Sequence, residues 1–405
     1  TQQEAVSTET EEEQTTDSST DAEWIENIML ATDIHYFSDS LTDGGPRFQE
    51  MVEYGDGKIV TYIDQITDAL NGEKASHKDL AEKLHRVENH GIPVLVIPGN
   101  HDINNHQAAR YKGEERLPAE YTTPAEFRQI YRAFGYDEAA SEDPNSLSYL
   151  YELDENTWLL MIDSCQYSPV NKVGGAISEA TYEWVEQQLE AAWDVGVEII
   201  PVAHHNLLDE SEIYVDECTI EHSEQFIDLL ETWDVPLFLS GHLHVQHCKR
   251  SEDNRGIWEM VTASLATPSC KYAILTYRDD RSFLYRTQSL DVEAWAKKNQ
   301  CTEEDLLNFK QFQTPFLRRV FYNQAIASLN EVPELTDSER EQMAQLYSLL
   351  KFHYYQGTAY QVQEPVRNDP AYELWQEDGM ATQQGEYFRY ILEDGKRDYN
   401  RLEVN

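Results

Sequence analysis

Residues 94–105 read VLVIPGNHDINN, an apolar run that passes directly into asparagine, histidine and aspartate. The run from Val94 to Ile97 is too short for a helix and predicts a buried strand. Pro98 and Gly99 end that strand, so the polar residues after it could form no more than a tight turn. The alternative is a functional site at the end of the strand, and the rest of the chain decides between the two.

Three further apolar runs are followed at once by polar residues. They are NIMLAT (27–32), EIIPVA (198–203) and PLFLS (236–240). Amphipathic helical patterns lie between these runs, and strands that alternate with helices predict an α/β fold. Later runs within 148–163 and 257–287 indicate hairpins, so we expect a mixed sheet or two packed sheets with outer helices.

Four polar clusters follow these runs. Together they contain six of the 13 histidines in the chain, accompanied by carboxylate and amide side chains. Loops that leave the carboxyl ends of strands in an open α/β sheet meet at one place, so we expect these side chains to converge. In chain order the clusters are Asp33 with His35; Asn100, His101 and Asp102; His204, His205 and Asn206; and His242 with His244.

Imidazole, carboxylate and amide oxygen together form a donor set that suits metals such as Zn, Mn or Fe. In D-x-H and H-x-H, alternate residues of an extended segment project to the same side, so two ligands can reach one ion. A two-metal site polarises a phosphoryl oxygen and activates water for in-line displacement. One such cluster is more often structural, but four of them behind apolar runs predict a metal site.

The order of these motifs resembles that of the calcineurin-like metallophosphoesterases, whose pattern is D-x-H, G-D, G-N-H-[DE], His and G-H-x-H. The likeness covers roughly residues 25–290. It implies an α/β fold, specifically a four-layer α/β/β/α sandwich of mixed sheets with a C-terminal helical subdomain. The stretch GNHDINNHQAAR (99–110) and the helical C-terminal pattern resemble secreted Gram-positive members of the family that are known as cyclic-nucleotide phosphodiesterases.

The resemblance also implies a role for each clustered residue. It implies two divalent or trivalent metal ions (Mn, Fe or Zn), one held by Asp33, His35 and His244 and the other by Asn100, His204 and His242. His101 would contact the phosphate and assist the leaving alkoxide, and Asp102 would orient its imidazole. His205 and His106 are further candidates for substrate contact. The other histidines, His247 among them, are interpreted as structural or exposed.

One element of the family pattern is missing from its expected place. The family has a strand ending in G-D between D-x-H and G-N-H-D, and its aspartate bridges both metals. Here VTYIDQITDAL (60–70) runs directly into a second helical stretch. Gly55-Asp56 comes too early for this role, and Asp68 falls within a helix-patterned run. We expect either that this sequence omits residues of the natural protein or that metal binding is weakened.

These features predict a metal-dependent phosphoric ester hydrolase. The expected reaction is the hydrolysis of a small phosphodiester, such as a cyclic nucleotide, by a metal-activated hydroxide. A phosphomonoesterase or nucleotidase is one alternative, because the same metal centre could support it. A metal-poor pseudoenzyme is the other, because the bridging aspartate is missing from its expected place.

Charge and composition limit the possible partners. The chain has 75 acidic and 31 basic residues and a net charge of −44, so a nucleic-acid polymer is not an expected partner. No apolar run approaches the roughly 18 residues that a bilayer span needs. Five cysteines without a C-x-x-C motif leave the redox compartment open.

The sequence divides into three expected regions. Residues 1–22 hold seven carboxylates and no Lys or Arg, and predict a disordered acidic tether. Residues 23–290 form the expected phosphoesterase domain, and 291–405 the helical subdomain. A tether ahead of a folded domain favours an extracytoplasmic protein, secreted or held at the cell surface by a lipid anchor upstream of the chain. A solvated tail without that role is the alternative.

Deletion of residues 1–22 should leave the melting temperature and the metal content unchanged, because the segment lacks the apolar side chains needed to pack. Differential scanning calorimetry and metal analysis of the two forms test this. A marked drop in melting temperature in the shortened form would contradict the tether interpretation.

Overall fold

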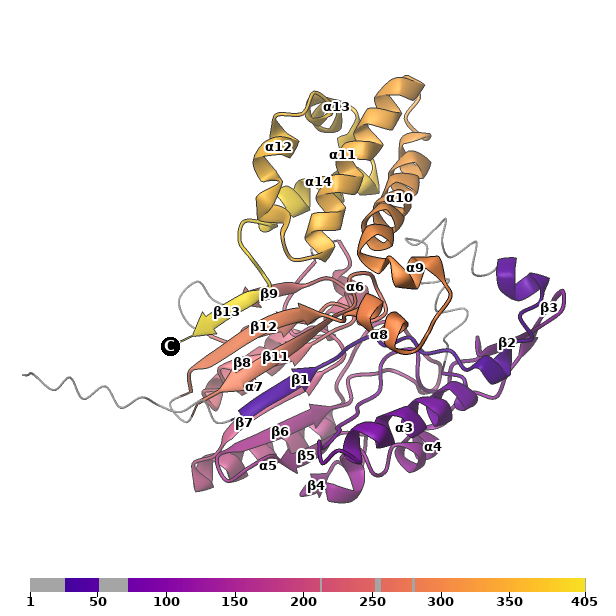
Figure 1. Ribbon diagram of the computed structural model, residues 1–405. Helices are drawn as coiled ribbons and strands as arrows, with labels where there is room; N and C mark the ends of the chain where they lie inside the picture. Colours follow the sequence, from indigo (N-terminus) through magenta and orange to yellow (C-terminus); the bar gives the residue numbers. More distant parts are fainter. Residues whose placement is uncertain (1–25, 51–71, 212, 252–255, 279–280, 405) are drawn as a thin grey trace, which may run out of the picture.

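The computed structural model describes residues 26–50, 72–211, 213–251, 256–278 and 281–404. Two β-sheets pack against each other, with helices outside them and a group of helices in the C-terminal part of the chain (Figure 1). The predicted fold class, an α/β sandwich of packed sheets with a C-terminal helical region, is confirmed.

The larger sheet has the strand order β4-β5-β6-β7-β8-β10-β9. Strands β6, β7, β8 and β10 are parallel neighbours, while β4, β5 and β9 pair antiparallel. The bounds are β4 (Ser141–Glu142), β5 (Tyr149–Glu152), β6 (Thr157–Ile162), β7 (Glu198–Ala203), β8 (Leu237–Ser240), β9 (His247–Arg250) and β10 (Trp258–Val261).

The smaller sheet is antiparallel and has the order β1-β11-β12-β13. A separate hairpin is formed by β2 and β3. The bounds are β1 (Glu26–Leu30), β11 (Lys271–Tyr277), β12 (Phe283–Ser289), β13 (Arg401–Val404), β2 (Ala109–Lys112) and β3 (Glu115–Pro118).

Helices cover the sheets and make up most of the C-terminal region. Those of the first region are α3 (Lys74–Glu88), α4 (Pro124–Ile130), α5 (Glu179–Val195), α6 (Val215–Cys218) and α7 (Ser223–Thr232), with 3-10 turns η1 (Asp39–Leu41) and η2 (Tyr136–Glu138). The C-terminal region contains α8 (Val292–Lys298), α9 (Glu304–Leu307), α10 (Phe309–Leu329), α11 (Asp337–Tyr355), α12 (Gln363–Arg367), α13 (Ala371–Glu377) and α14 (Gln383–Asp394), with η3 (Ala359–Gln361) and η4 (Gly379–Ala381).

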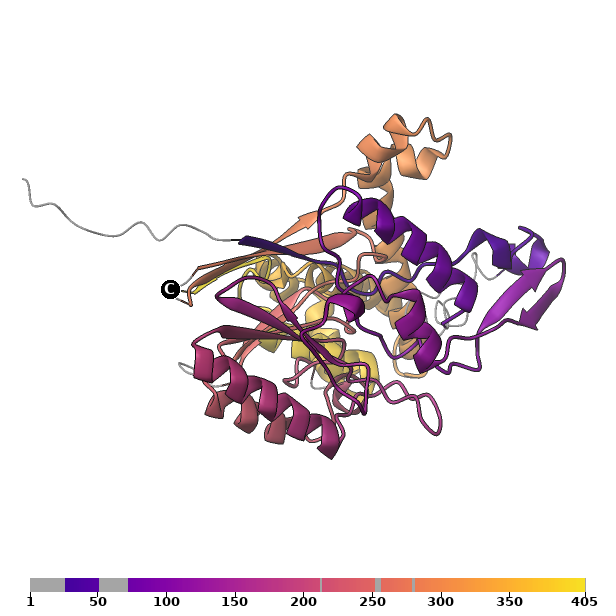
Figure 2. The same cartoon turned by 90° about the horizontal axis from the view of Figure 1, so that it is seen from below.

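Both faces of the larger sheet are buried. Leu159 and Met161 of β6 share a core cluster with Leu275 of the smaller sheet. The intervening Leu160 and Ile162 belong to a second cluster that contains residues of α5 and α7, which lie outside the sheet (Figure 2). Strands that are buried on both faces read as continuous apolar runs, which explains the predictions for β7 and β8.

The run from Val94 to Ile97 does not form the predicted strand. Its side chains are partly buried against the core between the sheets, but it pairs with no strand among the described residues. Val96 N–H instead donates to Phe134 O at 3.1 Å, and Val96 O accepts a hydrogen bond from Tyr149 Oη at 3.1 Å. A segment becomes a strand only when a neighbouring backbone satisfies its hydrogen bonds.

The family resemblance implies a strand ending in G-D before this run. Within the described residues β1 also pairs on one side only, with β11. Gly55-Asp56 and Asp68 lie outside the described residues, so the question of the bridging aspartate stays open.

The C-terminal region is joined closely to the rest of the fold. Its core cluster includes Leu243, Val245 and Val261 of the preceding region, and β13 pairs with β12 in the smaller sheet. The domain boundary at residue 290 stays a prediction, and the tether at 1–22 lies outside the described residues. Among the helices that the structure describes, none has the length and apolarity of a bilayer span.

The C-terminal core contains a buried lysine. Lys351 is 1% exposed, and its Nζ donates to Gln324 Oε1 at 2.6 Å and to Tyr347 Oη at 3.1 Å. The Nζ atom lies 4.5 Å from the centre of the Tyr387 ring. Burial lowers the pKa of Lys351 well below its ordinary value.

Replacing Lys351 by Met should stabilise the protein increasingly as the pH falls. Unfolded lysine is protonated below about pH 10, whereas the folded side chain resists protonation, so the wild-type unfolding free energy decreases as pH drops by up to about 1.4 kcal/mol per unit. Urea unfolding between about pH 7 and about pH 10 measures the difference between Lys351→Met and wild type. The exposed Lys298→Met is the control. A difference that does not change with pH would mean that Lys351 stays protonated in the fold.

Candidate metal centre

The four polar clusters meet in one place. Asp33 and His35 follow β1, His204 follows β7, and His242 and His244 follow β8. Asp33 Oδ1 lies 3.4 Å from His244 Nε2, and Asp33 Oδ2 accepts a hydrogen bond from His242 N at 3.0 Å. Strand ends that are far apart in the sequence therefore deliver their side chains to a common site, as the strand pattern predicts.

The first group of metal-type ligands is formed by Asp33, His35 and His244. The Nε2 atoms of the two histidines are 3.0 Å apart. Two ligand atoms bound to one ion at about 2.1 Å are about 3.0–3.4 Å apart in octahedral or tetrahedral geometry. The distances within this group therefore fit a single metal ion.

The second group contains His204 and His242, together with His205 or Asn100. His205, although close to both histidines, has no free ring nitrogen: Nε2 donates to Val173 O and Nδ1 accepts from Ser164 Oγ, both at 2.8 Å. Asn100 Oδ1, by contrast, lies 2.9 Å from His204 Nε2. The contacts thus favour Asn100, with His205 as a support behind the site.

The ring of His242 is oriented by the backbone. Its Nε2 lies 2.9 Å from the carbonyl oxygen of Glu217, which can only accept a hydrogen bond, so Nε2 carries the proton. The Nδ1 lone pair is then free for a metal ion. Metal-binding histidines usually donate their other ring N–H to such a partner.

Burial and neighbouring groups shift the pKa values of several side chains in this site. Burial is the main cause that lowers the pKa of His35 and of His205 to about 3, and it also lowers the pKa values of His204 and His242. Burial would raise the pKa of Asp33, but the neighbouring histidines, His244 foremost, lower it well below its usual value. These shifts favour an ionised Asp33 carboxylate and neutral imidazoles at His35, His204 and His242, which are the forms that bind metals.

The backbone of the metal-facing residues differs from the extended form expected from D-x-H and H-x-H. The φ angles are 50° at Asp33, 45° at His35, 68° at His242 and 60° at His244. A left-handed conformation costs a non-glycine residue about 1–3 kcal/mol. The expectation of extended segments is wrong because the chain turns sharply at each of these four residues.

Two glycines make room for the ligands. A Cβ atom at Gly99 would lie 3.1 Å from His204 Cε1, and one at Gly241 would lie 2.8 Å from Asp33 Oδ2. Glycine at these positions of G-N-H-D and G-H-L-H allows the backbone to approach the ligand side chains closely.

His101 lies beside the two groups. Its Nε2 is 3.2 Å from Asn100 Nδ2, and its ring centre is 6.5 Å from that of His35. Burial and the neighbouring histidines lower the pKa of His101 well below its ordinary value. The side chain is therefore a neutral imidazole next to the metal-type ligands, where a substrate phosphate could reach it.

The structure gives Asp102 a different contact from the predicted one. Its Oδ2 accepts a hydrogen bond from Gly99 N at 2.6 Å, and its Oδ1 lies 3.6 Å from His77 Nε2. No hydrogen bond joins Asp102 to His101 among the described residues. Because the Asp102 side chain folds back onto the start of the turn, it fixes the loop rather than the neighbouring ring.

His106 lies at the surface, where its ring packs edge-on against Tyr121, with the two ring centres 4.8 Å apart. The contacts that the structure gives it do not reach either ligand group.

No role was predicted for Glu259, which is buried. Its oxygens accept hydrogen bonds from Leu207 N at 2.9 Å, Leu208 N at 2.6 Å and Ser240 Oγ at 2.6 Å. Burial, followed by the nearby Glu210, raises the pKa of Glu259 to about 8. The carboxyl group links the loop after His204 to the end of β8 through these hydrogen bonds. The feature of the sequence that could have indicated this role is the isolated glutamate in the apolar run IWEMVT.

Comparisons with known proteins agree with this architecture. The sequence model of the calcineurin-like phosphoesterase family matches residues 27–246, which is more than half of the chain. A second family model, the C-terminal domain of cyclic nucleotide phosphodiesterase, matches residues 291–398. No curated protein matches the chain.

Among solved structures, the chain is similar to a dimetal phosphatase from Danio rerio, with 11% sequence identity and a TM-score of 0.38. The similarity covers 62% of this chain and 79% of the other. These values are too low to support any further inference.

Proposed function

This chain belongs to the calcineurin-like phosphoesterase family, and we propose that it is a phosphodiesterase acting on a small nucleotide, cyclic or linear, or a similar diester. Membership of the family makes it a metal-dependent phosphoester hydrolase. The observation that carries the proposal is the pair of ligand groups at the ends of β1, β7 and β8. The match of the C-terminal region to the cyclic nucleotide phosphodiesterase domain supports the choice of a diester.

Two metal ions, Mn, Fe or Zn, are part of this proposal. Asp33, His35 and His244 would hold one ion, and Asn100, His204 and His242 the other. Bound ions would polarise a phosphoryl oxygen and supply a hydroxide nucleophile at neutral pH. The family implies metal ions, and the donor atoms described above fit them.

The two groups differ in charge. The first contains the ionised Asp33 carboxylate, whereas the second consists of an amide and two neutral imidazoles. Among the described residues no carboxylate is shared by both groups. The first group should therefore bind a divalent cation more tightly than the second.

In this proposal His101 acts on the substrate rather than on the metals. As a neutral imidazole it can donate one N–H to the phosphate or to the leaving oxygen. A bound phosphate anion would raise the pKa of His101 and so favour the imidazolium form, which can give one proton to the leaving alkoxide and return to the neutral imidazole. Asp102 would contribute by holding the turn that presents His101, through its bond to Gly99 N–H.

Two alternatives use the same fold. A phosphomonoesterase or nucleotidase could use the same ions and His101. A metal-poor pseudoenzyme would follow if the second group fails to retain an ion without a bridging carboxylate. A small phosphoester rather than a nucleic-acid polymer remains the proposed substrate, and a location outside the cytoplasm, secreted or lipid-anchored, remains a proposal as well.

Removal of metal should abolish hydrolysis of an aryl phosphodiester, and Mn, Zn or Fe should restore it. Metal titration by calorimetry should resolve a tighter site that Asp33→Ala removes and a weaker site that His204→Ala removes. Full activity of a metal-free sample would contradict the proposal. A preference for the aryl phosphomonoester in the same panel would favour the nucleotidase, and metal binding without any turnover would favour the pseudoenzyme.

Substitution of His101 by Ala should lower kcat by about 10²–10⁴-fold and leave the metal content unchanged. Steady-state kinetics and metal analysis of the purified variant measure both effects. His106→Ala is the matched control, because this histidine is exposed on the same loop and should retain wild-type kcat. Loss of a metal equivalent in His101→Ala would show that His101 is a ligand instead.

A further inference from the structure

The segment that carries His242 and His244 has two functional sides. The two histidines face the metal centre, whereas Leu243 and Val245 are 7% and 1% exposed and belong to the core of the C-terminal helical region. The core cluster includes Leu317 and other residues of α10 and α11. The same four-residue stretch is therefore both part of the metal centre and part of the helical core.

This segment needs support from outside itself. Both histidines have a left-handed backbone, which an isolated peptide would relax to more favourable angles. Burial of the Leu243 and Val245 side chains fixes the positions that directly follow the two histidines. The helical core therefore adds to two local hydrogen bonds, from His242 N–H to Asp33 Oδ2 and from Leu243 N–H to Gly241 O, in favouring this conformation.

The residue after this segment is hydrogen-bonded to the C-terminal part of the chain. Gln246 N–H donates to Tyr355 O at 3.2 Å, at the end of α11, and Gln246 Nε2 donates to Tyr399 O at 3.1 Å. Gly357 lies against it: a Cβ atom there would be 2.9 Å from Gln246 Cγ. The chain thus cannot shift at Gln246 without moving the end of α11.

His247 completes the connection. Its side chain is 1% exposed; Nδ1 pairs with the buried Glu210, and Nε2 lies 2.7 Å from Asp394 Oδ2 on α14. Burial would lower the pKa of His247, but the two carboxylates raise it to about 10. The resulting imidazolium joins three elements: the loop after β7, the segment after β8, and the helical region.

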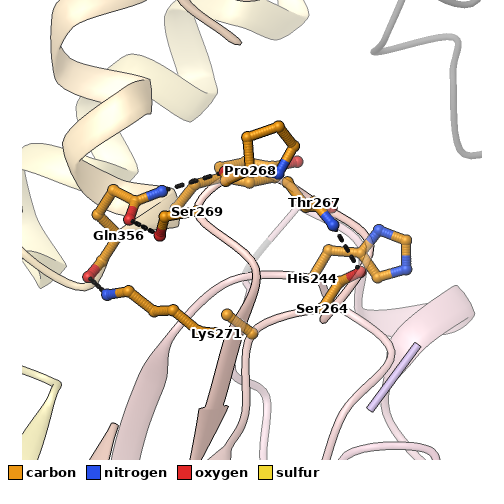
Figure 3. A pocket seen from close by; sticks show the side chains of 9 residues that line it. His244, Ser264, Thr267, Pro268, Ser269, Lys271 and Gln356 are labelled. Carbon is orange, nitrogen blue, oxygen red and sulfur yellow. Dashed lines mark hydrogen bonds between the residues drawn. The ribbon is translucent and has the colours of Figure 1, made fainter. Parts of the chain in front are cut away.

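Helical-region residues also lie on the other side of His244 (Figure 3). His244, Ser264, Lys271 and Gln356 line one small pocket there. Lys271 Nζ donates to Gln356 O at 2.6 Å, next to the end of α11, and Ser264 Oγ donates to Asp33 O at 2.9 Å. The helical region therefore also lies next to the first ligand group, at Gln356.

We propose that the helical region positions His242 and His244 for metal binding, and that Val245, Gln246 and His247 are the positioning residues through which it acts. The inference rests on the metal-dependent function proposed above. It gives the helical region a role in the chemistry of the site in addition to any contact with substrate.

The test compares two valine-to-alanine variants of the full chain. Val245 and Val366 are both buried in the same core cluster, with exposures of 1% and 0%, but Val366 lies on α12, far from the sheets (Figure 1). Each variant loses the same two methyl groups from the same core. A merely structural role of Val245 predicts that both variants lose thermal stability and neither loses metal affinity.

Mn²⁺ binding is measured by calorimetry together with the melting temperature of each variant. Val245→Ala should weaken Mn²⁺ binding by about 10–100-fold, as expected when a support of a metal ligand is removed, while Val366→Ala stays close to wild type. High Mn²⁺ concentrations should restore full occupancy in Val245→Ala. His247→Gln, which removes the imidazolium between Glu210 and Asp394, should weaken Mn²⁺ binding in the same way.

Equal metal affinities in all variants would overturn the inference and leave the proposed function intact, and so would equal losses in Val245→Ala and Val366→Ala. A wild-type protein that binds no Mn²⁺, Zn²⁺ or Fe²⁺ would instead overturn both. If His247→Gln does not fold, the valine pair still decides the question.

Discussion

The left-handed backbone of four metal-facing residues is the constraint on which the rest of the site depends. Asp33, His35, His242 and His244 all have positive φ angles, and at about 1–3 kcal/mol each their total cost is comparable with the net stability of a domain. The surrounding structure must offset this cost. Ser264 Oγ donates a hydrogen bond to the Asp33 carbonyl oxygen, and the Asp33 carboxylate accepts one from the His242 N–H. The helical core packs against Leu243 and Val245, the residues that follow His242 and His244. The geometry of the site therefore depends on the packing of the helical region against the rest of the fold.

Strands could be predicted from the sequence where a continuous apolar run reports burial on both faces. They could not be predicted where strand formation depends on a second backbone to pair with. EIIPVA and PLFLS coincide closely with β7 and β8 because strands that are covered on both faces leave continuous apolar runs. The run from Val94 to Ile97 is similarly apolar, and it is partly buried against the core between the sheets. It is not a strand, because pairing requires a second backbone, and a local run of residues contains no information on where that backbone lies.

The same distinction applies to the site. Positions after strands revealed which histidines converge, since sheet geometry brings strand ends together. The tautomer of His242 could not be found in this way, because it is set by a backbone carbonyl, at Glu217, and every residue has one. The role of His247 was missed for a related reason: its carboxylate partners, Glu210 and Asp394, are 37 and 147 positions away in the chain. A histidine without a nearby motif gives no sign of such partners.

The two ligand groups differ in charge, and this difference would affect both metal retention and attraction of the substrate. An ion held by Asn100, His204 and His242 would keep nearly all of its charge, since these ligands are neutral, whereas Asp33 would neutralise part of the charge of the other ion. In a chain with a net charge of −44, such an ion would supply local positive charge that attracts a phosphate anion. A carboxylate shared by both ions would hold them more tightly and attract the substrate less. If both groups bind metal as proposed, retention of metal and attraction of substrate would be opposed at this site, and the number of carboxylates around the second ion would set the balance between them.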